Sequence, residues 1–236
     1  MKQLHLIQLQ ILRKLLFATS LRYTEMKPDN EMLNNQFDFH LDQIIKEGWV
    51  TKTKEGYFLT SSGKEYANRM NTGTATIEKQ AKIGAIVCAI CERNGKRQYL
   101  VYTRLKQPFY GCQGFMSGKI AYGETVIDGA KRELKEETNL DGEPQVFSIR
   151  HFRVFDKQTG ELLEDKFLYY CLVRNPEGEI VDSAEGKYEW IDEDKIDSHV
   201  TNHFESLEVF KRDVEEINSF RGEIRFSEVD HISDKF

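Results

Sequence analysis

The sequence predicts an α+β fold, in which a mixed β-sheet is covered by helices and follows a small, mostly helical domain. Three observations predict it. The first 70 residues show helical periodicity broken by turn signals, apolar strand-like runs begin at Ile83, and only two long amphipathic helices accompany those runs. The predicted boundaries are 1–72 for the first domain, 73–80 for a linker, 81–222 for the second domain and 223–236 for a loosely held polar tail.

The first domain is predicted to contain helices, then a hairpin, then another helix. Apolar residues at helical spacing run from Leu4 to Phe17, and the turn signal Pro28-Asp29-Asn30 precedes a second periodic stretch, Glu31–Glu47. Short strands flank Lys54-Glu55-Gly56, and Ser61 is the expected cap of the last helix. This order resembles a winged helix-turn-helix domain.

The second domain is predicted to combine hairpins with two helices. The turn signals Asn94-Gly95 and Thr159-Gly160 each join two apolar runs. The predicted strands are Ile83–Cys91, Gln98–Thr103, Phe147–Phe155, Lys166–Arg174 and Lys187–Ile191, and the predicted helices are Glu124–Thr138 and His203–Phe220.

The amino-acid composition limits the classes of protein to which this chain can belong. With 39% hydrophobic and 31% charged residues and no apolar run near the roughly 20 residues that span a bilayer, a cytoplasmic globular protein without a membrane segment is expected. Residues 1–75 hold 10 basic and 8 acidic side chains, whereas the remainder hold 23 and 31, so the second domain needs cations to approach polyanionic substrates. Cys88 and Cys91 form a lone C-x-x-C pair, which favours buried thiols over a zinc site.

The chemistry is concentrated in the predicted helix Glu124–Thr138. Glu133, Glu136 and Glu137 fall within about one third of the helix circumference, at the border of its apolar arc. Like charges at this spacing weaken a helix, and Mg²⁺ offsets their repulsion because it prefers carboxylate oxygens. The alternative is a solvated charged face, and the position beside the apolar arc argues against it.

The segment 118–140 resembles the Nudix box, G-x5-E-x7-R-E-U-x-E-E-x-G-U, where U is a bulky aliphatic residue. The matching residues are Gly118, Glu124, Arg132, Glu133, Leu134, Glu136, Glu137 and Leu140. Asn139 replaces the last glycine at a helix end, where Asn tolerates a positive φ. Met116-Ser117 and Ala121 depart from the common pattern near the substrate loop, so the substrate is less well indicated than the catalytic residues.

The resemblance implies a Nudix-type sheet at 81–222 and a pyrophosphohydrolase that cleaves a nucleoside diphosphate linked to another moiety. Glu136, Glu137 and the Gly118 carbonyl would ligate Mg²⁺ or Mn²⁺. Glu133 would be a ligand or a base held by Arg132, and Glu124 would support the loop or a second metal. A general base from a later loop is expected among Glu177, Glu179 and Glu185, with Glu185 preferred.

The partners are less well defined. Phe109, Tyr110, Phe152 and Phe155 are candidates to stack on a base, although core packing is the alternative. Nudix domains joined to winged helices also occur in transcriptional regulators that sense nucleotide sugars, which makes a DNA-binding sensor the main rival to an enzyme; a catalytically silent nucleotide-binding scaffold is a third option.

The charge of the predicted recognition helix helps to distinguish a DNA-binding sensor from an enzyme. Glu31–Glu47 carries four acidic side chains against Lys46, which disfavours DNA as a partner. Asn34, Asn35, Gln36 and His40 are polar residues suited to reading base edges. Homodimerisation and covering of the substrate site are the other roles expected for this domain.

Overall fold

The computed structural model describes residues 4–29 and 31–236, and the chain divides into two compact units, Met1–Lys79 and Gln80–Phe236. Asn30, the last residue of the predicted turn, and the first three residues of the predicted first domain lie outside the described residues. The predicted α+β class is confirmed, with a small helical unit before a large mixed sheet. No helix among the described residues is long and apolar enough to cross a membrane.

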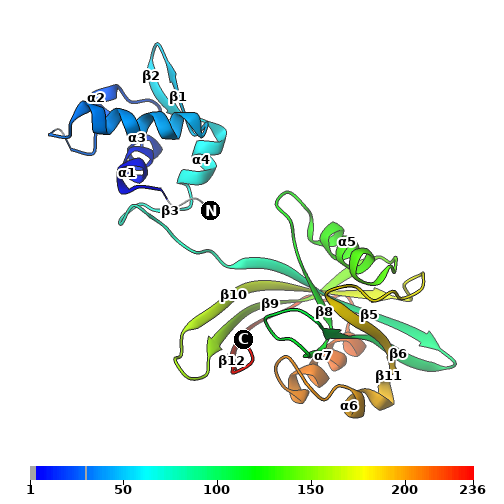
Figure 1. Ribbon diagram of the computed structural model, residues 1–236. Coiled ribbons are helices and arrows are strands. Elements are labelled where there is room, and N and C mark those ends of the chain that lie inside the picture. Colours follow the sequence, from blue (N-terminus) through cyan, green and yellow to red (C-terminus); the bar gives the residue numbers. More distant parts are fainter. Residues whose placement is uncertain (1–3, 30) are drawn as a thin grey trace. The chain divides into compact units, whose positions relative to one another are not determined.

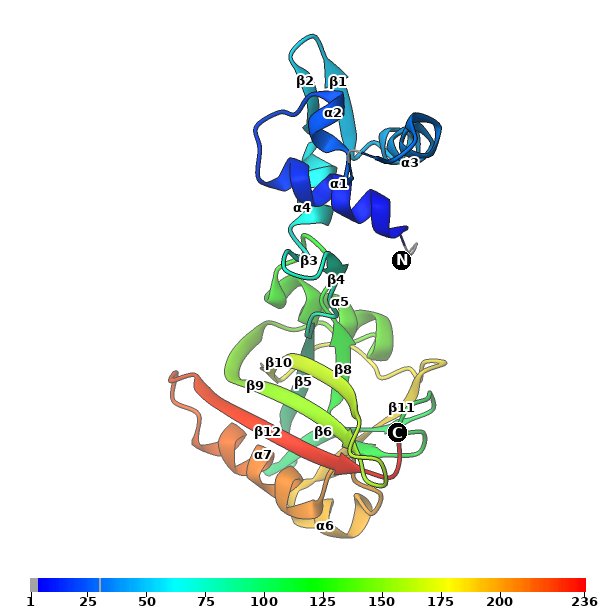
Figure 2. The same cartoon turned by 90° about the vertical axis from the view of Figure 1, so that its left-hand side faces the viewer.

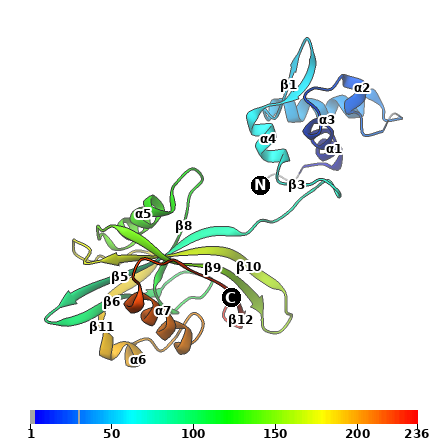
Figure 3. The ribbon, with the colours of Figure 1, turned by 180° about the vertical axis from the view of Figure 1, so that it is seen from behind.

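The first unit contains the predicted order of helices, hairpin and helix (Figures 1 and 3). Its elements are α1 Leu6–Leu16, α2 Tyr23–Met26, α3 Asn34–Lys46, β1 Val50–Thr53, β2 Gly56–Leu59, α4 Ser61–Ala67, β3 Met70–Asn71 and β4 Thr76–Ile77. The cap of α4 is Thr60 rather than Ser61, because the Thr60 hydroxyl accepts the Gly63 N–H at 3.0 Å. The hydrophobic core of the first unit includes Ile11, Leu12, Phe37 and Ile44, which are all fully buried.

The predicted linker is partly folded into the first unit. β3 and β4 pair antiparallel, and Ala75 between them is buried in the first core. The compact unit therefore extends to Lys79. Small polar residues such as those at 71–76 serve tight hairpins as well as linkers, so their composition did not distinguish the two.

The second unit is built on an eight-stranded sheet with the order β11-β6-β5-β10-β9-β12, to which β7 and β8 are added. The strands are β5 Lys82–Arg93, β6 Lys96–Arg104, β7 Gln113–Gly114, β8 Met116–Lys119, β9 Pro144–Asp156, β10 Leu162–Arg174, β11 Gly186–Asp192 and β12 Arg225–Ser233. Neighbouring strands are antiparallel except for β5 with β10 and β9 with β12. Every predicted strand is present, and each extends by one to four residues at one or both ends.

Helices cover both faces of this sheet (Figures 1 and 2). Helix α5, Val126–Thr138, buries Ala130 and Leu134 in one apolar cluster. Helices α6, Ile196–His199, and α7, Leu207–Ser219, bury Ile196, Phe210 and Ile217 in the other. The predicted helices began too early, at Glu124 and His203, because their caps are Thr125 and Ser206.

The expectation of a loosely held tail is wrong for most of its length. Strand β12 lies parallel to β9 at the edge of the sheet (Figure 2). Its acidic side chains pair with basic side chains on or just after β9: Arg153 lies 2.7 Å from Asp230, and Lys157 lies 3.0 Å from Asp234. The segment is too polar to be recognised as a strand by hydrophobic alternation, and its partner is 77 residues away in the chain.

Candidate functional site

The carboxylate-bearing helix α5 is defined locally by its caps. The Thr125 hydroxyl accepts the Asp128 N–H at 3.1 Å, and Asn139 ends the helix with φ 61°. The predicted left-handed conformation of Asn139 is therefore confirmed. Because α5 buries Ala130 and Leu134 against the sheet, the predicted carboxylates emerge at the edge of that buried face.

Arg132 connects three of these carboxylates rather than Glu133 alone. Its guanidinium donates to Glu124 at 2.8 Å, to Glu133 at 2.9 Å and to Glu136 at 2.9 Å. It also donates a second bond to Glu124 at 3.0 Å and one to the Lys119 carbonyl at 2.9 Å, and the latter ties α5 to β8. The Arg132 guanidinium lowers the pKa of Glu124 to about 2, and Glu124 raises the pKa of Arg132 in turn.

Glu133 is the most enclosed of the three carboxylates that Arg132 holds. It accepts the Lys119 N–H at 3.1 Å, and burial raises its pKa although Arg132 opposes the rise. The side chain lies directly on Gly118, where an added Cβ would overlap its Cγ and Cδ atoms. Glycine at 118 is therefore required by the close approach of Glu133.

Gly118→Ala should displace the Glu133 carboxylate from its position beside Lys119 and lower kcat/KM for any hydrolysed substrate by about 10²-fold, the scale of a roughly 1 Å misplacement. Unfolding temperature and steady-state rate should both be measured. Gly123→Ala is the matched control, since nothing lies within 4 Å of its Cβ position, although its φ of 86° predicts a small loss of stability. Unchanged kcat/KM in folded Gly118→Ala protein would contradict this placement of Glu133.

Glu137 has different partners from the other predicted ligands. Its carboxylate accepts hydrogen bonds from the Ser183 hydroxyl and, at 2.6 Å, from the Tyr188 hydroxyl. Burial and then the bond to Glu137 raise the pKa of Tyr188. Ser183 also accepts the N–H groups of Glu185 and Gly186, so the loop before β11 holds Glu137 in place. Neither Ser183 nor Tyr188 was predicted from the sequence.

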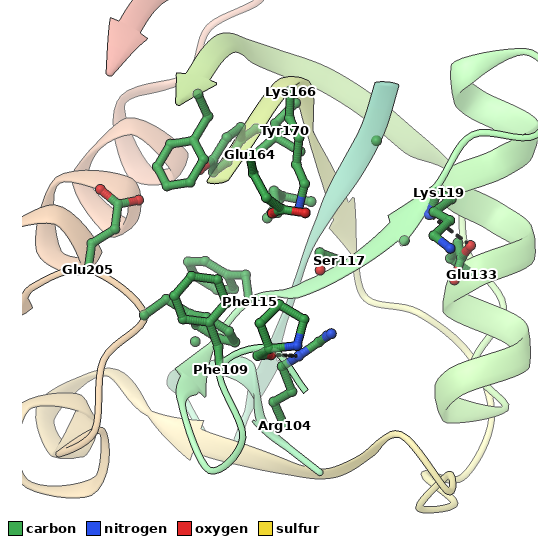
Figure 4. A pocket seen from close by; sticks show the side chains of 18 of the residues that line it. Arg104, Phe109, Phe115, Ser117, Lys119, Glu133, Glu164, Lys166, Tyr170 and Glu205 are labelled. Atoms are coloured by element: carbon green, nitrogen blue, oxygen red, sulfur yellow. Dashed lines mark hydrogen bonds and ion pairs between the residues drawn. The ribbon is translucent and has the colours of Figure 1, made fainter. Parts of the chain in front are cut away.

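A cavity of about 610 Å³ brings most of the predicted site residues together (Figure 4). Gly118, Glu133, Glu136, Glu137 and Glu185 line it, whereas Glu124, Glu177 and Glu179 do not. Glu185 forms an ion pair with Lys106 across the cavity rim. Of the predicted aromatic residues, Phe109 and Phe152 line the cavity, and Tyr110 and Phe155 do not.

The oxygen ligands at the α5 end of the cavity suit a hard divalent cation. Three carboxylates and the Gly118 carbonyl offer the oxygen ligands that Mg²⁺ prefers, and the bare Gly118 backbone lets Glu133 approach it closely. In the described part of the chain, no three acidic, His or Cys side chains are already gathered around one point. Arg132 holds Glu136, and Ser183 with Tyr188 holds Glu137.

The opposite end of the cavity contains polar groups that were not predicted. Glu205, just before α7, and Tyr170, on β10, line it together with Asp213 of α7. Behind them lies Arg150, which is 1% exposed, 2.6 Å from Asp213 and 2.9 Å from Glu216. The Arg150 guanidinium also lies 4.1 Å from the centre of the Tyr170 ring.

Burial is the main cause of the raised pKa values of Glu205 and Asp213. It raises the pKa of Glu205 to about 7, with Asp213 adding to the rise, and raises the pKa of Asp213 to about 6 despite the ion pair with Arg150. The signal for this cluster was present in the sequence. Asp213 falls between Phe210 and Ile217 in the apolar stripe of α7, where a charged side chain requires a buried partner.

These shifts predict how stability depends on pH. Because folding raises the pKa of Glu205 and Asp213, their contribution is full below about pH 4 and is lost as pH rises through 6 to 7. Glu124 contributes oppositely, since its lowered pKa makes its contribution disappear as pH falls from about 4.5 towards 2. The free energy of unfolding should therefore fall between pH 4.5 and 7, by on the order of 2–3 kcal/mol for Glu205.

Urea titrations at several pH values test this, with Glu205→Gln expected to flatten the slope. Glu215→Gln is the matched control, because Glu215 is an exposed acid on α7, the helix that follows Glu205. An identical slope in Glu205→Gln and the unaltered protein would show that Glu205 is not the group responsible.

Comparison with known proteins agrees with the geometry. The family model described as "NUDIX domain" matches residues 82–212. The chain is similar in structure to the mutator MutT protein from Bacillus halodurans, with a TM-score of 0.51 and 20% identity over 66% of this chain and 93% of that one. It is also similar to the NUDIX domain of Shewanella oneidensis NrtR complexed with ADP ribose, with a TM-score of 0.50 and 13% identity over 67% of this chain and 99% of that one.

Proposed function

The chain belongs to the NUDIX family, and we propose that it hydrolyses a phosphoanhydride bond in a nucleoside diphosphate linked to another moiety, with Mg²⁺ or Mn²⁺ as cofactor. One observation carries the proposal. Glu133, Glu136 and Glu137 line one end of a cavity whose other lining residues include several aromatic side chains. This arrangement suits a substrate with a polyanionic centre and a planar group.

Glu136, Glu137 and the Gly118 carbonyl would hold the cation, with Glu133 as either a further ligand or the base. When bound, such a cation neutralises the diphosphate and lowers the pKa of the attacking water. Arg132 orients Glu133 and Glu136 through its two 2.9 Å bonds, and Ser183 with Tyr188 orients Glu137. Glu124 does not line the cavity, so its proposed role is to fix Arg132 rather than to hold a second metal.

Two carboxylates are candidates to accept the proton of the attacking water. Glu133 lies deeper and has a raised pKa, which favours proton uptake. Glu185 lies on the loop before β11 and lines the same cavity, but Lys106 must move away before its carboxylate is free. A Lys106→Ala variant distinguishes them, because it should raise the rate only if Glu185 is the base.

Arg104 is the proposed contact for the substrate phosphates. It lines the cavity, and its guanidinium is held by the Pro108 carbonyl at 2.7 Å and the Tyr102 hydroxyl at 2.9 Å. Among the described residues no carboxylate pairs with it. Its charge is therefore available to an anionic ligand, and two of its N–H groups have no acceptor in the part of the chain that the structure describes.

The test is a hydrolysis screen with Mg²⁺, Mn²⁺ and EDTA. It would offer nucleoside triphosphates, ADP-ribose, NADH, dinucleoside polyphosphates and nucleotide sugars. Cation-dependent turnover of one class is the expected result. Absence of turnover in every class, with tight binding of one compound, would overturn the enzyme and favour a sensor.

A DNA-binding sensor is the second candidate, favoured by the order of helices and hairpin in the first unit. The exposed strand β1 carries Lys52, and Lys54 follows in the turn, which places positive charge on the hairpin. Helix α3 opposes this with Asp38 and Asp42. Retardation of random duplex DNA by the full chain, weakening steeply with salt, would support the sensor, and absence of binding at 50 mM salt would exclude it.

A further inference from the structure

The end of the cavity farthest from Glu133 has features that the proposed chemistry does not use. We name Glu205, Asp213 and Tyr170 the Glu205 cluster. Figure 4 shows Glu205 and Glu133 on opposite sides of the cavity, with Ser117 and Phe115 between them. A ligand whose diphosphate lies at the carboxylates of α5 would therefore extend its other end towards the Glu205 cluster.

This end of the cavity contains more acidic side chains than are needed to pair with the buried Arg150. Arg150 is a single buried cation, and Asp213 and Glu216 already pair with it at 2.6 and 2.9 Å. Glu205 is half-buried and makes no hydrogen bond or ion pair with any described residue. Stabilising Arg150 therefore explains Asp213 and Glu216 but leaves Glu205 without a partner.

Tyr170 gives a second, independent indication of a ligand. The residue is 4% exposed and lines the cavity, yet its hydroxyl has no hydrogen-bond partner among the described residues. Because the residue lines the cavity, a bound polar group can reach this hydroxyl and pair with it. Carboxyl and hydroxyl oxygens therefore line the same end of the cavity.

Several phenylalanines line this cavity together with aliphatic and charged side chains. Phe109, Phe115, Phe152 and Phe210 line the same cavity, and Phe115 and Phe210 lie 5.0 Å apart between ring centres. Aromatic faces stack on planar rings, and polar groups at the end of such a slot read the edge of the ring. Carboxyl oxygens accept hydrogen bonds, so the edge that fits carries N–H donors.

We propose that the Glu205 cluster binds the amino-bearing edge of a nucleobase, so that the protein prefers adenine, guanine and cytosine nucleotides to those of hypoxanthine and uracil. This inference rests on the proposed function for the nucleotide class of the ligand. Adenine and cytosine carry an exocyclic amino group where hypoxanthine and uracil carry a carbonyl, and guanine differs from hypoxanthine by one amino group. A carbonyl facing Glu205 would leave two acceptors opposed.

The ionised form of Glu205 supports this assignment. Its pKa is about 7, so above that pH most of the group is a carboxylate, which offers acceptors only and pairs with amino and ring N–H donors but not with a carbonyl. The groups that face it are Asp213 and Arg212 of α7, Arg150 of β9 and Tyr170 of β10.

The experiment is calorimetric titration of the full chain at pH 8, where Glu205 is mostly ionised, with ADP, GDP, CDP, UDP and IDP in EDTA, so that no hydrolysis occurs. We expect GDP and ADP to bind at least about tenfold more tightly than IDP, and CDP more tightly than UDP, since sites built for a hydrogen bond reject ligands that lack it. Glu205→Gln should reduce each ratio to about threefold or less, and Tyr170→Phe should reduce at least one. Glu215→Gln should leave all ratios unchanged.

Equal affinities within each pair, ratios that survive in Glu205→Gln, or no binding of any diphosphate would overturn the inference. The outcomes are separable from those of the proposed function. Selective binding without hydrolysis of any compound keeps the inference and removes the enzyme. Cation-dependent hydrolysis without base preference does the reverse.

Discussion

Glu136→Gln is expected to lower kcat/KM by about 10³-fold, because the change removes a proposed cation ligand that stabilises charge in the transition state. The fold should be retained. Glu136 is 60% exposed, its bond with Arg132 spans one turn of α5, and glutamine preserves both its size and its helix propensity. The measurement is steady-state hydrolysis of the best compound from the screen, beside thermal unfolding of the same preparation.

Two controls make this result specific. Glu179→Gln removes the same charge from an exposed acid that does not line the cavity, and its activity should stay within about twofold, as expected of a distant surface change. Binding of Mn²⁺ to each variant, followed by electron paramagnetic resonance, should weaken for Glu136→Gln alone. Near-full activity of a folded Glu136→Gln protein would rule out the proposed cation site.

Arg150→Ala is expected to destabilise the second unit by about 3–5 kcal/mol, because it leaves buried acids without their cation. Arg150 is the largest fully buried side chain, and Asp213 and Glu216 both pair with it. The loss should be smaller at pH 5 than at pH 8, since the raised pKa of Asp213 allows that carboxyl to become neutral. Urea unfolding at both pH values measures the difference.

Arg153→Ala is the matched control on the same strand. Arg153 forms an exposed ion pair with Asp230, so its loss should cost less than about 1 kcal/mol at either pH. Similar losses for the two variants would show that burial of Arg150 has no special energetic role. Retained secondary structure by circular dichroism is needed to interpret either value.

The order of the main helices and hairpins and the relative position of the carboxylates on α5 were determined by the sequence itself. Helix α5 has a Thr cap, an Asn at its left-handed end and an apolar stripe, and these local features place Glu133, Glu136 and Glu137 relative to one another. The hairpin turns at Asn94-Gly95 and Thr159-Gly160 are local in the same way, and β5–β6 and β9–β10 pair as expected. Such features depend on residues within one or two turns of each other.

The division of partners among those carboxylates was decided by the tertiary structure. Glu137 meets Ser183 and Tyr188, 46 and 51 residues away, and Glu185 meets Lys106, 79 residues away. The predicted shared cluster therefore separates into an Arg132 group and a Glu137 group. No periodicity within α5 indicates which loop will close over it, because that depends on how β11 docks beside β6.

The group of residues at the end of the cavity farthest from Glu133 and the pairing of strand β12 were likewise decided by the tertiary structure. Arg150, Tyr170, Glu205 and Asp213 come from two strands, a loop and a helix, and only the packing of α7 on the sheet joins them. Asp213 in an apolar stripe indicated that a buried partner exists, but not which residue it is. Local sequence determines which face of an element is buried, whereas the identity of the group opposite is set by chain topology and register.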